Sequence, residues 1–347
     1  MESAKFSVCT VLNDEIYTLT LREHILEQIN KKTLKVNYIK DIDGYPDKGR
    51  KTINIIAKNG SYIYLVEYDG CRLIQLSLKN KKAKIFDIEL QENGGYSSIE
   101  FFENYVYLFP SRQNYIVKID IGKNTINKKA SVFKNLEPKK NSDMMRTCSS
   151  TFCRENKVYI FMKESNQIAV YDLKNDRFEN YFIDTNQCGI KAVHNYENAE
   201  YLLDMEGKLW IFNQDTMKLE LVVDTLEDKY YYIDFLICDS SLIFLPCFGE
   251  NIKIYKNGEL EIYRNYPEDI KFVENKEHSK YYGYGEDENY YYVAMHSANY
   301  LLMINKHTGK FNWSKIKENY EAYSQYHEGV ISEKSVDLRE FIEHQIR

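Results

Sequence analysis

Six cationic or aromatic residues stand in short polar stretches between apolar segments, and their side chains are suited to binding a ligand. They are Arg112, Arg146, Lys163, Lys191, Tyr230 and His296. Guanidinium and ammonium groups beside aromatic rings can hold an anionic or sugar-like ligand. Exposed loops are polar in any case, so this interpretation requires a fold that brings the six stretches to one face.

Motifs of known catalytic chemistry do not occur in the sequence. It has neither the Gly-x-Ser-x-Gly turn of a serine hydrolase nor a phosphate-binding P-loop. The seven histidines show no spacing typical of metal ligands. We therefore predict no metal ion and no cofactor, and the sequence identifies no catalytic residue. Ligands or carboxylates contributed by distant segments would not form a visible motif.

Charge and composition argue against nucleic-acid binding and against a membrane-spanning helix. The net charge is −6, and acidic and basic residues alternate without a basic block. No apolar stretch approaches the ~18 residues that a membrane-spanning helix needs. The first residues lack the apolar core of a signal peptide.

The seven cysteines are odd in number and include no Cys-x-x-Cys pair. This pattern is typical of reduced thiols, so we expect a cytoplasmic protein whose cysteines are small core residues. The sequence also contains 31 tyrosines and 17 phenylalanines. Aromatic residues suit strands, which is one interpretation of this abundance. An aromatic surface that binds a glycan, a peptide or a partner protein is the other.

A short apolar and aromatic segment recurs seven times along the chain. The anchor residues of these segments are Tyr17, Tyr64, Tyr107, Tyr159, Tyr201, Ile243 and Tyr292. Successive anchors are 42 to 52 residues apart, close to the roughly 40–50 residues of a four-stranded repeat. One apolar segment precedes each anchor and two follow it, and many alternate apolar and polar residues as half-buried strands do.

Seven units of four strands cannot each bury both faces alone, whereas a radial arrangement packs their sheets face to face. We therefore predict an all-β fold, a seven-bladed β-propeller of four-stranded antiparallel blades. The blades are expected near residues 6–41, 49–90, 94–133, 146–185, 188–226, 230–266 and 280–317. Six or eight blades are the alternatives. The sequence also leaves open whether the N-terminal strand completes the last blade or belongs to the first.

The stretch KHTGKFNW, residues 306–313, links the last two strands of the seventh repeat. It resembles the repeats of quinone-binding and kelch-type propellers, in which a Thr-Gly-Lys-like turn follows a strand. Only this repeat carries Thr308, Gly309 and Lys310 together with Trp313. A quinone-binding family would carry such a Trp in most blades. We therefore interpret the stretch as a hairpin turn that needs a positive φ angle, which Gly, Asn or Asp would supply in the equivalent turns.

Two long junctions and the C-terminal tail have open roles. Residues 134–147 and 267–285 are either functional loops or inert insertions. The propeller domain is expected to span 1–317 and the tail 318–347. Within the tail, the apolar residues Leu338, Phe341, Ile342 and Ile346 predict one stripe of a short helix. This helix would either pack under the propeller or dock a partner protein.

Three classes of function fit such a chain. The first is a non-catalytic scaffold that presents one face to a protein or peptide partner. The second is a propeller enzyme, a lyase or hydrolase acting on a sugar or a modified peptide at the mouth of the central channel. The third is a sensor of small molecules. An enzyme should gather His, Tyr and carboxylate groups at the channel, whereas a scaffold should show a broad, shallow aromatic face.

Overall fold

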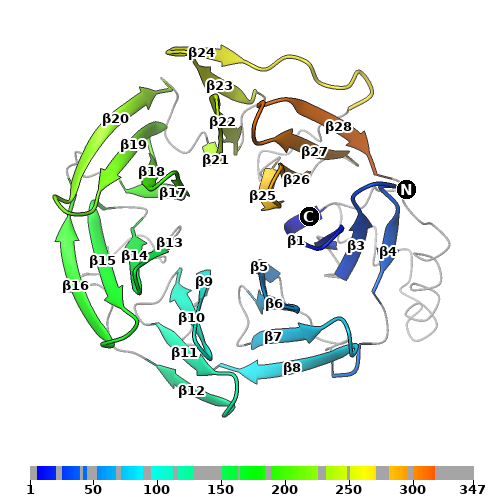
Figure 1. Ribbon diagram of the computed structural model, residues 1–347, viewed down its shortest axis with the longest axis vertical. Helices are drawn as coiled ribbons and strands as arrows, with labels where there is room; N and C mark the ends of the chain where they lie inside the picture. Colours follow the sequence, from blue (N-terminus) through cyan, green and yellow to red (C-terminus); the bar gives the residue numbers. More distant parts are fainter. Residues whose placement is uncertain are drawn as a thin grey trace, which may run out of the picture.

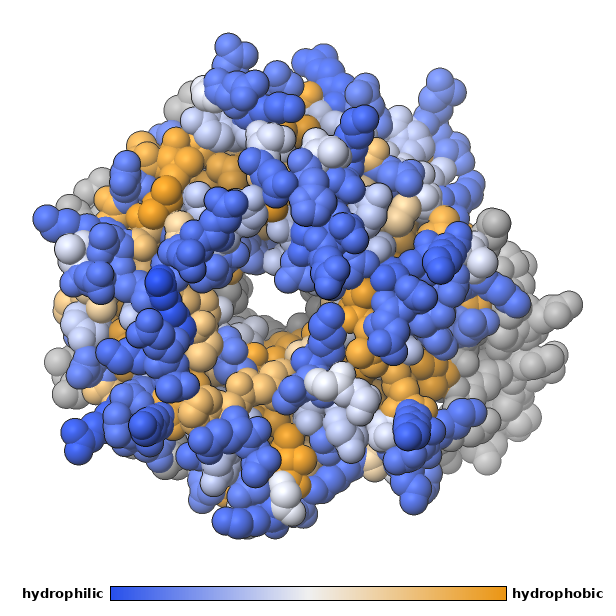
Figure 2. Space-filling model, in the orientation of Figure 1, coloured by the Kyte–Doolittle hydropathy of each residue, from blue (hydrophilic) through white to orange (hydrophobic). Residues whose placement is uncertain are grey.

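Seven four-stranded antiparallel sheets form a ring around a central channel in the computed structural model (Figure 1). The residues that it describes are 6–20, 26–39, 42–44, 53–67, 72–88, 95–111, 116–128, 151–162, 165–183, 189–225, 232–247, 251–270, 281–295 and 300–316. Within each sheet the strands follow the order of the chain. The prediction of a seven-bladed β-propeller is confirmed, and the space-filling view shows the hollow at its centre (Figure 2).

Each blade consists of four consecutive strands, with the first strand beside the channel and the fourth at the outer rim (Figure 1). The strands of blades 1 to 4 are β1 (Phe6–Leu12), β2 (Glu15–Thr20), β3 (Leu26–Asn30), β4 (Val36–Tyr38), β5 (Ile53–Asn59), β6 (Tyr62–Glu67), β7 (Arg72–Ser77), β8 (Lys82–Asp87), β9 (Tyr96–Phe102), β10 (Tyr105–Pro110), β11 (Val117–Asp120), β12 (Thr125–Lys128), β13 (Thr151–Arg154), β14 (Lys157–Phe161), β15 (Gln167–Asp172) and β16 (Arg177–Phe182). Those of blades 5 to 7 are β17 (Ile190–Tyr196), β18 (Ala199–Asp204), β19 (Lys208–Asn213), β20 (Lys218–Asp224), β21 (Tyr232–Cys238), β22 (Ser241–Pro246), β23 (Lys253–Lys256), β24 (Glu259–Ile262), β25 (Tyr281–Glu286), β26 (Tyr290–Met295), β27 (Tyr300–Asn305) and β28 (Phe311–Lys315).

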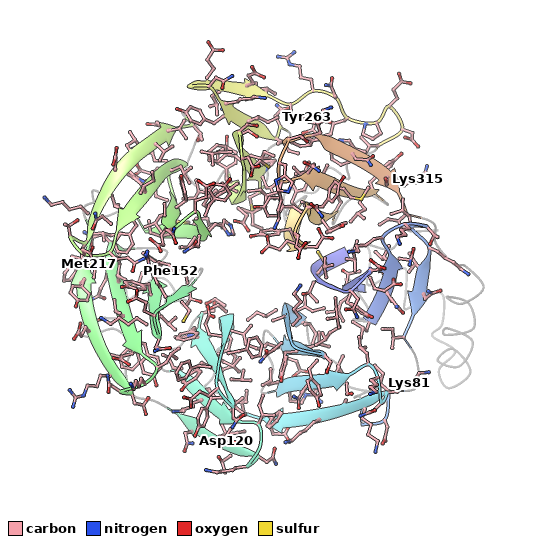
Figure 3. All side chains as sticks on the ribbon, viewed as in Figure 1. Lys81, Asp120, Phe152, Met217, Tyr263 and Lys315 are labelled. Carbon is pink, nitrogen blue, oxygen red and sulfur yellow. The ribbon has the colours of Figure 1, made fainter. Side chains whose placement is uncertain are left out.

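The hydrophobic core lies between neighbouring blades rather than in one central mass. Each cluster of buried side chains joins two blades; one of them packs Tyr64 and Phe86 of blade 2 against Tyr96 and Val106 of blade 3. Phe152 lies close to the channel, whereas Met217 lies at the outer rim (Figure 3). Because many tyrosines and phenylalanines fill these interfaces, the abundance of aromatic residues serves the packing of strands in the described part of the chain.

Among the described strands the ring closes by packing, without an exchange of strands between its first and last blades. β1 pairs with β2 and so belongs to blade 1, which answers the question that the sequence left open. A Cβ atom on Gly285 of β25 would lie 3.0 Å from the Cα of Thr10 in β1. Glycine therefore allows the two inner strands to approach closely. At the same junction Lys31 Nζ lies 2.9 Å from Asp287 Oδ2.

The stretch KHTGK is a structural turn, as predicted. The Asn305 Oδ1 atom accepts a hydrogen bond from the Thr308 amide at 2.9 Å, and Gly309 has a φ of 65°. Asn30 and Asp172 stabilise equivalent turns in the same way. The expectation that only Gly, Asn or Asp would supply the positive φ is wrong. Three other residues do so in the turns after β3, β7 and β19, namely Leu34, Lys81 and Met217. The turn requires a left-handed backbone conformation at this position whatever the side chain. For a residue other than glycine, this conformation costs about 1–2 kcal/mol.

Several sequence predictions fall outside the described residues. These are the junction 134–147 and the C-terminal helix, together with the tail that contains it. Part of the other junction is described: Asp269 Oδ2 lies 2.9 Å from Lys315 Nζ, so this segment packs beside blade 7. The described residues contain no helix of the length and apolarity needed to cross a bilayer.

Candidate functional site

Of the six residues predicted to bind a ligand, the structure describes Lys191, which lies half-buried near the start of β17. The other five fall outside the described residues, namely Arg112, Arg146, Lys163, Tyr230 and His296. The convergence of all six on one face therefore remains a prediction. The described part of the channel wall, by contrast, carries a cluster that the sequence did not identify.

The inner strands of blades 5, 6 and 7 lie side by side along the channel (Figure 1). Each of these strands has a register shift near its start. The shift lies between Ile190 and Ala192 in β17, between Tyr232 and Asp234 in β21, and between Tyr281 and Gly283 in β25. A bulge of this kind turns the following side chains and strengthens the local twist. Polar side chains that follow the bulges then meet across the blades.

His194 is the centre of a hydrogen-bonded array that spans these three blades. Its Nε2 atom lies 2.6 Å from Asp234 Oδ1 on β21, and its Nδ1 atom lies 3.0 Å from the Tyr284 hydroxyl on β25. The side chains of His194 and Asp234 are 21% and 22% exposed. The array is therefore held within the protein yet remains partly open to solvent.

With Asp234 ionised and His194 neutral, the hydrogen-bond partners determine which atom carries the proton in each hydrogen bond. The backbone amide of Phe235 donates to Asp234 Oδ1 at 2.8 Å, which orients the carboxylate. An ionised carboxylate only accepts hydrogen bonds, so the neutral imidazole must carry its proton on Nε2. Nδ1 is then an acceptor, and Tyr284 donates its phenol proton to it. The rings of Phe235 and Tyr284 pack on the imidazole, with centroids at 4.7 and 5.6 Å.

The phenol of Tyr284 stays neutral under ordinary conditions. Burial raises the pKa of Tyr284 well above its usual value, and the negative charge of Asp234 raises it further. A phenol of this kind does not act as a stable phenolate. It can pass its own proton to Nδ1 while its oxygen accepts another, which is the behaviour of a relay.

A second polar cluster joins the inner strands of blades 3 and 4. Thr151 Oγ1 lies 3.0 Å from Glu100 Oε1 and 3.0 Å from Ser98 Oγ. Burial raises the pKa of Glu100 to about 7, and the hydrogen bond from Thr151 partly opposes that shift. A carboxyl group that titrates near neutral pH is suited to general acid–base chemistry.

Cys153 lies near this second cluster, but its thiol is not activated. Partial desolvation of the thiol, and then the charge of Glu100, raise the pKa of Cys153 to about 11, although the residue as a whole is exposed. A protonated thiol is a poor nucleophile, so cysteine chemistry is disfavoured here. Cys153 is also exposed, which corrects the expectation that the cysteines are core residues; the other described cysteines, Cys9, Cys238 and Cys247, are buried.

The described residues contain no group of three or more His, Cys, Asp or Glu side chains that could hold a metal ion.

No family model matches the chain, and no curated protein matches its sequence. Among solved structures, the chain is similar to a streptogramin B lyase, with a TM-score of 0.66 and 12% identity over 90% of this chain and 95% of that one. It is also similar to the computationally designed Ika8 protein, with a TM-score of 0.55 and 10% identity over 91% and 90% of the two chains. At these identities the likeness concerns the propeller fold alone.

Proposed function

We propose that the protein is an enzyme that transfers protons at the channel wall of blades 5 to 7. The observation that carries this proposal is the continuous array of Tyr284, His194 and Asp234, in which a half-buried tyrosine faces an imidazole that a carboxylate orients. His, Tyr and carboxylate groups gathered at a channel are what an enzyme requires. Arrays that only join blades also exist, so the proposal depends on a chemical test.

In this proposal Tyr284 is the group that touches the substrate. The substrate gives up a proton to the phenol oxygen while the phenol proton moves to His194 Nδ1. The resulting imidazolium is stabilised by Asp234, since the two groups then form an ion pair with a short hydrogen bond. The net base is His194, and the phenol never has to exist as a free phenolate, which agrees with its raised pKa.

Glu100 lies across the channel on β9 of blade 3, and we propose that it is the complementary acid for a substrate that spans the channel. With a pKa of about 7 it carries a proton in much of the population at neutral pH. As the bond from carbon to the leaving oxygen breaks, Glu100 gives that oxygen its proton. The electrons for this cleavage come from the C–H bond that the base has broken, in a lyase; in a hydrolase the base instead takes its proton from a water molecule, whose oxygen attacks the substrate.

The substrate class that we propose is a sugar or a modified peptide with an oxygen leaving group. A lyase with a similar fold has been solved, the streptogramin B lyase, which supports the view that this scaffold can hold such chemistry. No disulfide joins the four described cysteines to one another, which supports a cytoplasmic location.

A purely structural scaffold is less well supported by the described surface. It requires a broad aromatic face, yet the exposed large apolar side chains of the described residues are scattered over different blades. They are Tyr62, Phe182, Leu221 and Ile262. Single exposed apolar residues of this kind are normal on a soluble protein.

A panel of substrates tests the proposal. We would incubate the protein with uronate-containing oligosaccharides, with lactones and with ester-linked cyclic peptides that include a streptogramin B. Mass spectrometry detects the water added by hydrolysis, and ultraviolet absorbance detects the double bond formed by elimination. For any probe that is converted, Tyr284→Phe should lower the rate roughly 10²–10⁴-fold, since it removes the relay oxygen and keeps the ring.

Tyr62→Phe is the matched control, because Tyr62 is 39% exposed on a different blade. It should leave the rate unchanged. Conversion of no probe, or equal rates for Tyr284→Phe and the wild-type protein, contradicts the proposal.

A further inference from the structure

A pocket lies between blades 4 and 5, away from the Tyr284–His194–Asp234 array. Its volume is about 770 Å³, within the usual range for ligand sites. It is bounded by the β13–β14 turn of blade 4 and by two turns of blade 5, between β17 and β18 and between β19 and β20. Met217 belongs to the β19–β20 turn and marks the position of this turn at the outer rim (Figure 3).

One wall of the pocket is a fixed and neutral ion pair. Arg154 Nη1 lies 3.0 Å from Glu200 Oε1, and the side chain of Glu200 is only 2% exposed. Asn195 Nδ2 also donates to Glu200 Oε1, at 3.3 Å. Because its charge is matched by Glu200, Arg154 does not make the pocket positive. Its remaining N–H groups are still hydrogen-bond donors.

The rest of the polar lining is predominantly acidic. Glu155, Asp215 and Glu220 are exposed side chains that line the pocket, with Lys218 as the only other charged group of the described lining. No ion pair joins these three carboxylates to a cation among the described residues. The pKa of nearby Tyr159 is raised most by burial and next by Glu200; Arg154 lowers it, and Asp215 and Glu155 raise it further.

Apolar and amide groups complete the pocket. Phe212 is buried beneath it, and Ile211 and Leu219 contribute half-buried apolar surface. Gln214 also lines the pocket, and its Nε2 atom is buried without an acceptor among the described residues. An amide donor in that state costs about 1–3 kcal/mol. Turning it toward a carbonyl group in the pocket would recover that cost.

We infer that this pocket binds a short basic segment of peptide. A Lys or Arg side chain of the peptide would lie among Glu155, Asp215 and Glu220, and its aliphatic stem would pack on Ile211 and Leu219. The peptide carbonyl groups would accept hydrogen bonds from Gln214 and Arg154. An anionic ligand is disfavoured because three carboxylates face one lysine. The inference does not depend on the proposed enzymatic activity.

Fluorescence anisotropy tests this inference with three labelled heptapeptides on the full-length protein. One alternates Gly with Lys, one alternates Gly with Glu, and one alternates Gly with Ser. The Lys peptide should bind with a dissociation constant on the order of 1–100 μM, and the other two at least roughly tenfold more weakly. Binding of the Lys peptide should weaken as salt is added, since exposed charges are screened.

A charge-matched pair of variants locates the site. The pocket variant combines Glu155→Gln, Asp215→Asn and Glu220→Gln. The control combines Glu259→Gln, Glu261→Gln and Glu268→Gln, which are exposed residues on blade 6 and the segment after it. The pocket variant should lower the affinity for the Lys peptide tenfold or more, because each exposed charge pair can contribute up to about 1 kcal/mol. The control should change it less than about twofold.

Any of three results would overturn the inference. One is equal loss of binding in the pocket variant and the control, which means that the peptide senses only the net charge. Another is tighter binding of the Ser or Glu peptide than of the Lys peptide. Lack of any peptide binding up to about 1 mM, the weak limit of specific recognition, also refutes it. None of these results bears on Tyr284, so failure of this inference and failure of the proposed enzymatic function are separate outcomes.

Discussion

The Nε2 atom of His194 on blade 5 lies 2.6 Å from the Oδ1 atom of Asp234 on blade 6. The two residues are 40 positions apart, about one repeat of the fold. Since both belong to inner strands whose backbones are fixed by their own blades, the imidazole is held before any ligand arrives. Preorganisation of this kind is what proton transfer at a fixed site requires.

Asp234→Asn tests whether this orientation matters. The amide has the same size, but its nitrogen can donate where the carboxylate only accepts, so His194 loses the partner that fixes its tautomer and stabilises its charged form. For a probe that the wild-type protein converts, we expect a roughly 10²–10⁴-fold slower rate. The melting temperature should fall by only a few degrees. Asp87→Asn, at an exposed position of β8, is the control and should retain full activity.

Glu100 should make stability depend on pH in an unusual direction. Burial raises its pKa from 4.5 to about 7, so between these values the folded protein binds a proton that the unfolded chain releases. The contribution of Glu100 to the free energy of unfolding is therefore present below pH 4.5 and is lost as pH rises through 7. Its charged form then opposes folding.

Urea unfolding of the wild-type protein and of Glu100→Gln at pH 5 and pH 8 measures this effect. The Gln variant should gain stability relative to the wild-type protein on going to the higher pH, by on the order of 2–3 kcal/mol at most. A difference between the two proteins that is the same at both pH values would mean that Glu100 titrates normally.

Gly285→Ala tests how the ring closes. The added Cβ would lie 3.0 Å from Thr10 Cα and 3.1 Å from the Thr10 carbonyl carbon. Backbone atoms cannot move aside cheaply, so we expect a loss of about 1–3 kcal/mol in the free energy of unfolding. Gly122→Ala, where the nearest contact is the end of the Asp120 side chain at 3.4 Å, should change stability little. Equal effects of the two substitutions in thermal unfolding would argue that β1 and β25 are not tightly packed.

The fold could be predicted from the sequence because a propeller repeats its local pattern. Tyr64 and Tyr107 are buried in equivalent strands, and the strands before and after them recur at the same distances. The turns were less predictable, since Leu34 adopts a positive φ that its side chain does not favour. The Asn30 Oδ1 atom accepts a hydrogen bond from the Thr33 amide and so stabilises this turn, and a single sequence does not display such compensation.

The channel array could not be predicted in the same way. His194 and Tyr284 are 90 positions apart, and no local motif links them. The signal that existed was faint: each is a polar or ionisable residue in the first strand of its repeat, where most neighbours are apolar. The sequence instead favours loops as the place for ligand-binding residues, since loops commonly carry function. Of the six residues predicted to bind a ligand, the structure describes only Lys191.

The tautomer of His194 tests the central claim most directly and needs no substrate. A two-dimensional ¹H–¹⁵N spectrum of the histidine side chains, assigned by comparison with His194→Gln, reports which ring nitrogen carries the proton. The Tyr284–His194–Asp234 array predicts a neutral ring protonated on Nε2, with Nδ1 free of hydrogen and accepting from the phenol. It further predicts that Tyr284→Phe shifts the Nδ1 resonance and leaves Nε2 protonated. A ring protonated on Nδ1, or one that exchanges between both forms as a free imidazole does, would contradict the account.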